Sequence, residues 1–188
     1  CAFGYEALKA NTTGASNTGL GFESLKNNTT GNYNTASGFQ ALRNNQTGDG
    51  NVAVGCEALE TLTTANSTTA VGKDAGKLIT TGSYNHLFGI AAGDAITTGA
   101  NNTIMGHYAG SGFSTGSENT IIGGNAGGTT TAGITGNTYI GKSCAQNVTG
   151  NYNVFVGQMA AVWGSGNAAS NVGVGNNAME DITTGDDN

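Results

Sequence analysis

The chain has 188 residues, of which 33 are glycine and none is proline, and it carries a net charge of −6. Only six Lys and Arg residues are present, which excludes the basic patch that a nucleic-acid-binding surface needs. Charged residues make up 10% of the chain and hydrophobic residues 37%, and both recur at fixed positions, so the composition does not indicate disorder.

No apolar run approaches the length of about 18 residues that a membrane-spanning helix requires, so we expect no membrane insertion of this segment. The start at Cys1 carries no signal-peptide pattern and falls within a repeat, which favours a cut fragment over a lipoprotein terminus. Cys56 and Cys144 occupy different repeat positions, so the cysteines indicate neither a disulfide framework nor a zinc site.

The dominant signal is an internal repeat of 17 residues, marked by one recurring glycine that we call the anchor. After eight repeats the steps become 18, 16 and 18 residues, as expected if loops between coils absorb single-residue changes. The anchors are, in chain order, Gly4, Gly21, Gly38, Gly55, Gly72, Gly89, Gly106, Gly123, Gly141, Gly157 and Gly175.

Each repeat is predicted to form a short strand that ends just before its anchor, because β-branched and apolar residues alternate there with period two. The first column is β-branched: Thr18, Thr35, Val52, Thr69, Thr103, Thr120, Thr138, Val154 and Val172. The second precedes the anchor: Phe3, Leu20, Val54, Val71, Phe88, Met105, Ile122, Ile140, Val156 and Val174, with Ser37 the polar exception. We expect the second column to face a core.

The residue between these two columns is then expected to face outward, and it is apolar: Ala36, Ala53, Ala70, Leu87, Ile104, Ile121, Tyr139 and Phe155. A strand that is apolar on both faces needs a cover on its outer side. In a thin fibre the natural cover is another copy, so we predict a homo-oligomer with three copies.

After the anchor, a small residue recurs three positions on, at Ala41, Ala58 and Ala75 for example, and predicts close packing. A helical turn over 5–9 is the competing interpretation, but the Leu of the early repeats becomes Gly76, Gly93, Gly110 and Gly127 later, which disfavours it.

Two further columns belong to turns. The asparagines Asn17, Asn34, Asn51, Asn85, Asn102 and Asn119 are expected to stack as a ladder at a left-handed turn and to bond the next coil. The glycines Gly14, Gly31, Gly48, Gly82, Gly99, Gly116 and Gly133 are expected to supply positive φ at another corner.

The predicted fold is therefore all-β, a parallel β-solenoid (β-roll) of about eleven 17-residue coils. We interpret 1–188 as a single repeat array, uncapped at both ends and a slice of a longer fibre.

The segment Asn51–Gly55 (Asn-Val-Ala-Val-Gly) closely resembles the Val-Ala-Ile-Gly core of head repeats in trimeric autotransporter adhesins, which form a left-handed parallel β-roll. The fuller unit, 34–42 with Thr-Thr-Gly closing the turn, resembles repeats of phage tail fibres and large surface proteins. The adhesin repeat is shorter by about three residues, so each coil here carries an extra loop. The resemblance covers the whole chain and implies an extracellular fibre on a cell surface or virion that serves as a spacer or an attachment surface. It implies no particular binding residue.

The sequence predicts no catalytic, cofactor-binding or metal-binding residues, and hence no enzyme. His86 and His107 lie at different repeat offsets, without a carboxylate or Cys in register. Gly173–Ala178 matches a dinucleotide-binding pattern only by letter, because it lies within the repeat. The acidic column, Glu6, Glu23, Gln40, Glu57 and Asp74, is expected to pair with Lys9, Lys26, Arg43 and Lys77.

An alternative function is ice binding through threonine ladders, formed by the pairs 12–13, 29–30, 63–64, 80–81 and 97–98. Against it, adjacent Thr side chains point to opposite sides of a strand. A cell-surface receptor or a polysaccharide is a possible partner, with Tyr33, Tyr84 and Tyr152 as candidate sugar contacts. Asn-x-Ser/Thr sequons occur at Asn11, Asn28, Asn45, Asn66, Asn101 and Asn147, where they also suit turns.

Overall fold

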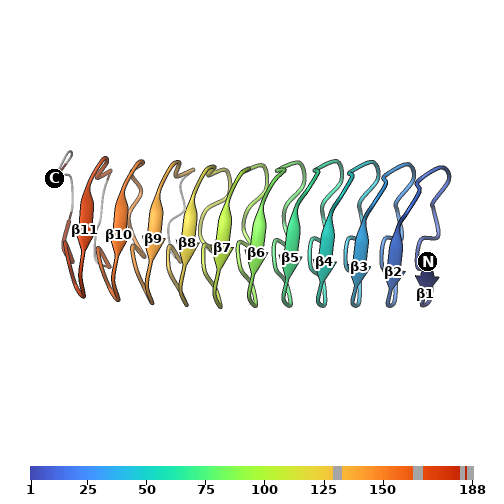
Figure 1. Ribbon diagram of the computed structural model, residues 1–188, viewed down its shortest axis with the longest axis horizontal. Helices are drawn as coiled ribbons and strands as arrows, with labels where there is room; N and C mark the ends of the chain where they lie inside the picture. Colours follow the sequence, from blue (N-terminus) through green and yellow to red (C-terminus); the bar gives the residue numbers. More distant parts are fainter. Residues whose placement is uncertain (129–132, 163–166, 183–184, 186–188) are drawn as a thin grey trace.

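The computed structural model of this chain describes residues 1–128, 133–162, 167–182 and 185. Its strands form a single parallel sheet in chain order, and the chain makes about ten turns of about 17 residues (Figure 1). The strands are β1 (Ala2–Phe3), β2 (Thr18–Leu20), β3 (Thr35–Ser37), β4 (Val52–Val54), β5 (Thr69–Val71), β6 (His86–Phe88), β7 (Thr103–Met105), β8 (Thr120–Ile122), β9 (Thr138–Ile140), β10 (Val154–Val156) and β11 (Val172–Val174). The all-β solenoid is confirmed, and no helix occurs in the described residues.

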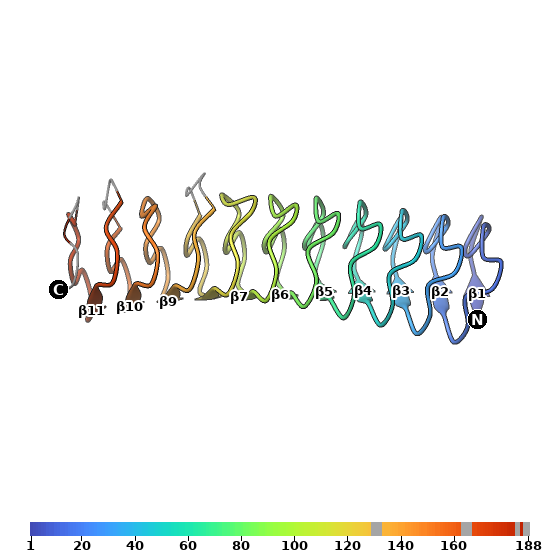
Figure 2. The same cartoon turned by 90° about the horizontal axis from the view of Figure 1, so that it is seen from above.

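The coils stack into a rod whose long axis runs across the strands, with β1 and β11 at opposite ends (Figure 1). Figure 2 shows the strands along one side of the rod and the turns on the other. The steps of 18, 16 and 18 residues leave β8 to β11 paired position by position, so the length changes fall outside the strands, as predicted. Ten rises of about 4.8 Å give a rod about 48 Å long.

The anchor glycines hold the backbone where each strand turns. Their φ values lie between 132° and 145°, where L side chains are disfavoured. At every anchor from Gly4 to Gly157, an added Cβ would also collide with the carbonyl oxygen of the next anchor along the rod. Both constraints select glycine, which explains why this column is invariant through eleven repeats.

The predicted orientation of the strands is wrong. In β2 to β11 the middle residue of each strand lies toward the inside of the coil and is buried, whereas the flanking residues are exposed or half-buried. We call the buried set the inner column: Gly19, Ala36, Ala53, Ala70, Leu87, Ile104, Ile121, Tyr139, Phe155 and Gly173. A coil this thin admits one inward residue per three-residue strand, so only the middle position can fill the interior.

The inner column packs against residues that lie four positions after each anchor. Leu42, Leu59 and Gly93 are buried members of this turn column, which reads Leu8, Leu25, Leu42, Leu59, Gly76, Gly93, Gly110, Gly127, Ala145, Ala161 and Met179. A Cβ on Gly76 would lie 2.6 Å from Leu87 Cδ1, so the glycine makes room for that leucine. Where the turn residue is Leu, the inner residue that follows is Gly or Ala, and where it is Gly, the inner residue is large.

The small column three residues after each anchor is fully buried from Ser24 to Ala160, which confirms the close packing predicted there. The segment that suggested a helix is instead a turn with left-handed residues, because Glu6 and Leu8 both have φ of 54°.

The asparagine ladder is confirmed and extends further than predicted. In Asn34, Nδ2 donates to the carbonyl of Gly48 at 2.7 Å, and Oδ1 accepts from the backbone N–H of Asn51 at 2.9 Å. Asn137, Asn153 and Asn171 continue it, and Thr68 takes one place. These asparagines are buried and not left-handed; the residue before each, such as Ser16 at φ 58°, takes the left-handed conformation.

The second glycine column was predicted to supply positive φ, and this is wrong. Gly14, Gly31 and Gly48 lie outside the left-handed region, but a Cβ on each would collide with the next coil's carbonyl oxygen. Close approach of two backbones is therefore the reason for glycine here. Ile134, not Gly133, continues the column, since its carbonyl is the one that Asn119 Nδ2 bonds at 2.8 Å.

Candidate functional site

In the described part of the chain no pocket is found, and no group of three or more His, Cys, Asp or Glu side chains could hold a metal ion. Candidate functional residues therefore have to be sought on the outer surface of the coils. No helix in the described residues could span a membrane.

The outward side of the sheet carries the most extensive apolar surface. The column before each anchor, predicted to be core, is exposed or half-buried and runs the length of the rod: Phe3, Leu20, Val54, Val71, Phe88, Met105, Ile122, Ile140, Val156 and Val174. The β-branched column lies beside it on the same side of the strands, with His86 in β6. We call these two columns together the sheet face.

At the N-terminal end the sheet face is widened by aromatic residues that directly follow the anchors. Tyr5 stacks on Phe22 with ring centroids 5.1 Å apart, and Phe22 stacks on Phe39 at 5.3 Å. Ile90 extends this column, whereas Lys73 and Lys142 occupy it elsewhere. The apolar surface is therefore broadest over the first coils.

The predicted pairing of the acidic column with the basic residues is confirmed for the first five coils. Lys26 Nζ lies 2.6 Å from Glu6 Oε2 and 2.7 Å from Glu23 Oε1, so one cation bridges two coils. Arg43 continues the series to Glu23 at 2.9 Å, and Lys77 binds Glu57 at 2.5 Å. The acidic and basic side chains of these coils thus pair with one another, and this pairing accounts for the carboxylates structurally.

These contacts shift the ionisation of the charged groups. The hydrogen bond from Lys26, helped by that from Lys9, lowers the pKa of Glu6 to about 2. The pKa of Glu23 is likewise lowered, chiefly by Lys26, and that of Lys26 is raised, chiefly by Glu23. Further along the rod, burial raises the pKa of Asp94 above its usual value.

The predicted histidine and cysteine positions are not brought together. His86 is exposed on β6, and His107 packs edge-on against Tyr108 with centroids 4.3 Å apart. Cys144 is buried in the core, and this burial raises the pKa of its thiol to about 12. Cys1 is exposed and Cys56 half-buried, and all three cysteines are free.

The two threonines of each pair have different roles. The first Thr of each pair bonds the next coil, as when Thr29 Oγ1 donates to the Gln46 carbonyl at 2.9 Å and Thr80 Oγ1 to the Thr97 carbonyl at 3.2 Å. The first Thr is half-buried except at exposed Thr12, whereas the second position is exposed throughout, in the column Thr13, Thr30, Thr47, Thr64, Thr81, Thr98 and Thr115. Beyond the first coil, the surface proposed for ice is thus one threonine wide.

The sequon asparagines differ in their exposure to solvent. Asn28 and Asn45 are fully buried, and Asn45 Nδ2 donates to Asn28 Oδ1 at 2.9 Å and to the Gly48 carbonyl at 3.0 Å. A glycan on either nitrogen is incompatible with this fold. Asn66 and Asn101 are exposed.

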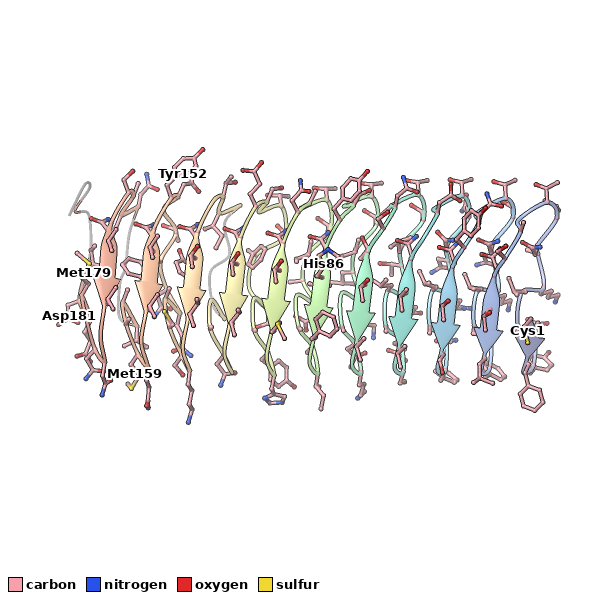
Figure 3. The ribbon with its side chains drawn as sticks, viewed as in Figure 1. Cys1, His86, Tyr152, Met159, Met179 and Asp181 are labelled. Atoms are coloured by element: carbon pink, nitrogen blue, oxygen red, sulfur yellow. The ribbon has the colours of Figure 1, made fainter. Side chains whose placement is uncertain are left out.

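The candidate sugar contacts occupy equivalent places in three coils. The backbone N–H groups of Tyr33, Tyr84 and Tyr152 donate to carbonyls of the preceding coil, each at 3.0 Å. All three side chains are exposed, and Figure 3 shows Tyr152 pointing away from the rod at the edge of the coils. We call these residues the tyrosine row.

Comparison with protein-family models, with curated proteins and with solved structures finds no match to this chain.

Proposed function

We propose that this chain is a non-catalytic segment of an extracellular fibre, built by copies of the chain that pack through the sheet face. The observation that carries the proposal is the apolar column before the anchors, which is apolar at every coil except that of Ser37 and extends from β1 to β11. Monomeric proteins rarely leave a contiguous apolar patch of more than a few hundred Å² in water.

The size of the sheet face suits an interface between copies. The three residues of each strand span about 10 Å, and the eleven strands span about 48 Å. The resulting footprint is about 480 Å², and exposed apolar surface on that scale often marks an interaction site. The low charge of its two columns favours a partner that is itself apolar, and a second copy offers such a surface in matching register.

Three copies are the expected number, in keeping with the resemblance of 51–55 to the adhesin repeat. The inner column, from which the sequence predicted an oligomer, is buried in the coil. The column before the anchors replaces it as the surface that needs a cover. The fibre's function is then geometric, because each coil adds a fixed rise of about 4.8 Å and sets the reach of whatever the fibre displays.

The test is the mass of the chain in solution by light scattering at micromolar concentration, with circular dichroism as the check on β-structure. We expect a multiple of 18.6 kDa for the parent chain and 18.6 kDa for Val71→Lys/Met105→Lys, which places two charges on the sheet face. The matched control is Thr81→Lys/Thr98→Lys, which adds the same charges at exposed turn positions and should keep the parent mass. A monomeric parent chain, or equal masses for the two variants, would overturn the proposal.

A further inference from the structure

The tyrosine row is conspicuous for its backbone. Tyr33, Tyr84 and Tyr152 have φ of 58°, 61° and 60°, in the left-handed region that bulky L residues rarely adopt. Other coils place Ser16, Ser67, Ser170, Gly50, Gly136, Asn101 and Glu118 at this position. Serine, glycine, asparagine or glutamate therefore suffices to make the turn, and the fold itself gives no reason for tyrosine.

Packing does not compensate for this conformation. Left-handed Leu25, Leu42 and Leu59 are fully buried, so core contacts offset their strain, whereas Tyr33, Tyr84 and Tyr152 are 70%, 54% and 63% exposed. None of the three takes part in the ring stacks found among the described residues. Backbone strain that packing does not offset clusters at ligand-binding and other functional sites, and here it draws attention to the exposed rings.

The surroundings of the row are polar. Each tyrosine directly follows a residue whose side-chain oxygen accepts from the preceding coil: Asn32 Oδ1 from Ala15 N–H at 2.8 Å, Ser83 Oγ from Asn66 N–H at 3.0 Å, and Asn151 Oδ1 from Thr135 N–H at 2.8 Å. An oxygen with one such bond keeps a second lone pair. A flat ring beside fixed oxygen acceptors suits a ligand that alternates apolar C–H faces with hydroxyl donors.

We propose that the tyrosine row is a binding site for a neutral polysaccharide, with each ring stacking on the C–H face of one sugar unit. The rings are three and four coils apart, about 14 Å and 19 Å. They are too far apart to form one apolar patch for a protein partner, but one long chain can contact several of them in turn. Asp49 and Glu118 lie along the same edge, and the net charge is −6, which together disfavour acidic glycans.

The experiment is native electrophoresis through gels that contain one soluble neutral polysaccharide each: hydroxyethylcellulose, xylan, mannan or dextran. We expect at least one of them to retard the parent chain. Replacement of all three tyrosines by serine, Tyr33→Ser/Tyr84→Ser/Tyr152→Ser, should abolish the retardation, and each single change should weaken it about 2- to 10-fold. Serine already stands at this position in three coils, so these variants keep a residue that the turn accepts.

The matched control is Tyr108→Ser. Tyr108 is also exposed and left-handed, but it packs against His107, and Ser143 occupies its repeat position in another coil. This variant should bind like the parent chain. The proposal is overturned if no polysaccharide retards the parent chain, if the triple variant is retarded as strongly, or if Tyr108→Ser loses binding equally. It is also overturned if the triple variant changes the mass in solution, because the row would then be a contact between copies. Since the row lies outside the sheet face, its failure leaves the assembly proposal standing.

Discussion

The first coils and the central coils build the same backbone with different side chains. In residues 18–62 the inner column is Gly or Ala, the turn column is Leu, and buried asparagines and ion pairs bond coil to coil. In residues 87–127 the inner column is Leu or Ile, the turn column is Gly, and Ile96 and Phe113 stand at the repeat position of buried Asn28 and Asn45. The comparison shows that the coil specifies a total interior volume and leaves open which position supplies it.

The largest loss of stability should come from changing the anchor glycines, which both regions share. Gly38→Ala and Gly89→Ala each place a side chain at φ of 145° or 140° and drive Cβ into the next anchor's carbonyl. We expect each to lower the free energy of unfolding by more than about 3 kcal/mol, measured by urea titration. The control is Gly19→Ala in the inner column, where the next three coils have alanine, with a loss within about 1 kcal/mol. A clear difference between the losses at the two anchors would contradict the claim that both regions share one backbone.

The next-largest loss of stability tests whether the inner column and the turn column share one interior volume. Leu42→Gly removes a buried side chain and should cost about 2–5 kcal/mol, while Ala53→Leu overfills the same coil and should cost about 1–3 kcal/mol. The double variant recreates the arrangement of Gly76 and Leu87, so it should lose less than the sum of the two by about 1–3 kcal/mol. Additive losses in the same titration would mean that the two columns do not share one space.

A smaller effect concerns the asparagine ladder, which crosses both regions. Asn102→Ala leaves the Gly116 carbonyl and the Asn119 N–H without their partners at 2.9 Å and 3.0 Å, which should cost about 2–3 kcal/mol. Asn102→Thr should cost less, since the Thr68 hydroxyl fills the same place: it donates to the Gly82 carbonyl and accepts from the Asn85 N–H, each at 3.5 Å. Conversely, Thr68→Asn should raise the thermal midpoint. If Asn102→Ala leaves that midpoint unchanged, the ladder does not hold the coils together.

The smallest effect should distinguish the regions by charge. The pKa of Glu6 is lowered to about 2 by Lys26 and Lys9, so its contribution is complete above the unfolded value of about 4.5 and is lost as the pH falls toward 2. Glu6→Gln/Glu23→Gln should therefore reduce the fall in thermal midpoint between pH 6 and pH 3. The uncharged change Thr98→Ser serves as the control, and an unaltered acid response in the Gln variant would contradict the pairing.

The sequence was sufficient to predict the coil, the strand positions, the asparagine ladder and the ion pairs, because each shows as a column with its own chemistry. It did not give the orientation of the strands, since alternation with period two fixes which residues share a side but not which side is inside. The signal that could have decided it is the inverse change in size between Leu59 and Ala70 and between Gly76 and Leu87, always 11 residues apart in these coils.

The predicted positive φ of the second glycine column was wrong for a related reason. Positive φ and close backbone approach both select glycine, so the residue type alone cannot separate them. Ala65, Ile134 and Ala168 occupy equivalent places in that column and are buried, and residues with side chains rarely take positive φ. They were the evidence against a left-handed corner. The strain in the tyrosine row, by contrast, is a property of φ and could not be predicted from the sequence.

The central claim is that the middle residue of each strand is inside the coil and its neighbours are outside, since the proposed sheet face depends on it. Ala70→Cys and Val71→Cys test it in a background with Cys1→Ser and Cys56→Ser, where only buried Cys144 remains. We predict that Cys at 71 reacts with a maleimide, or forms a disulfide with another copy under oxidation, while Cys at 70 does neither until the protein is unfolded. The reverse result, with position 70 reactive and position 71 protected, would contradict the account.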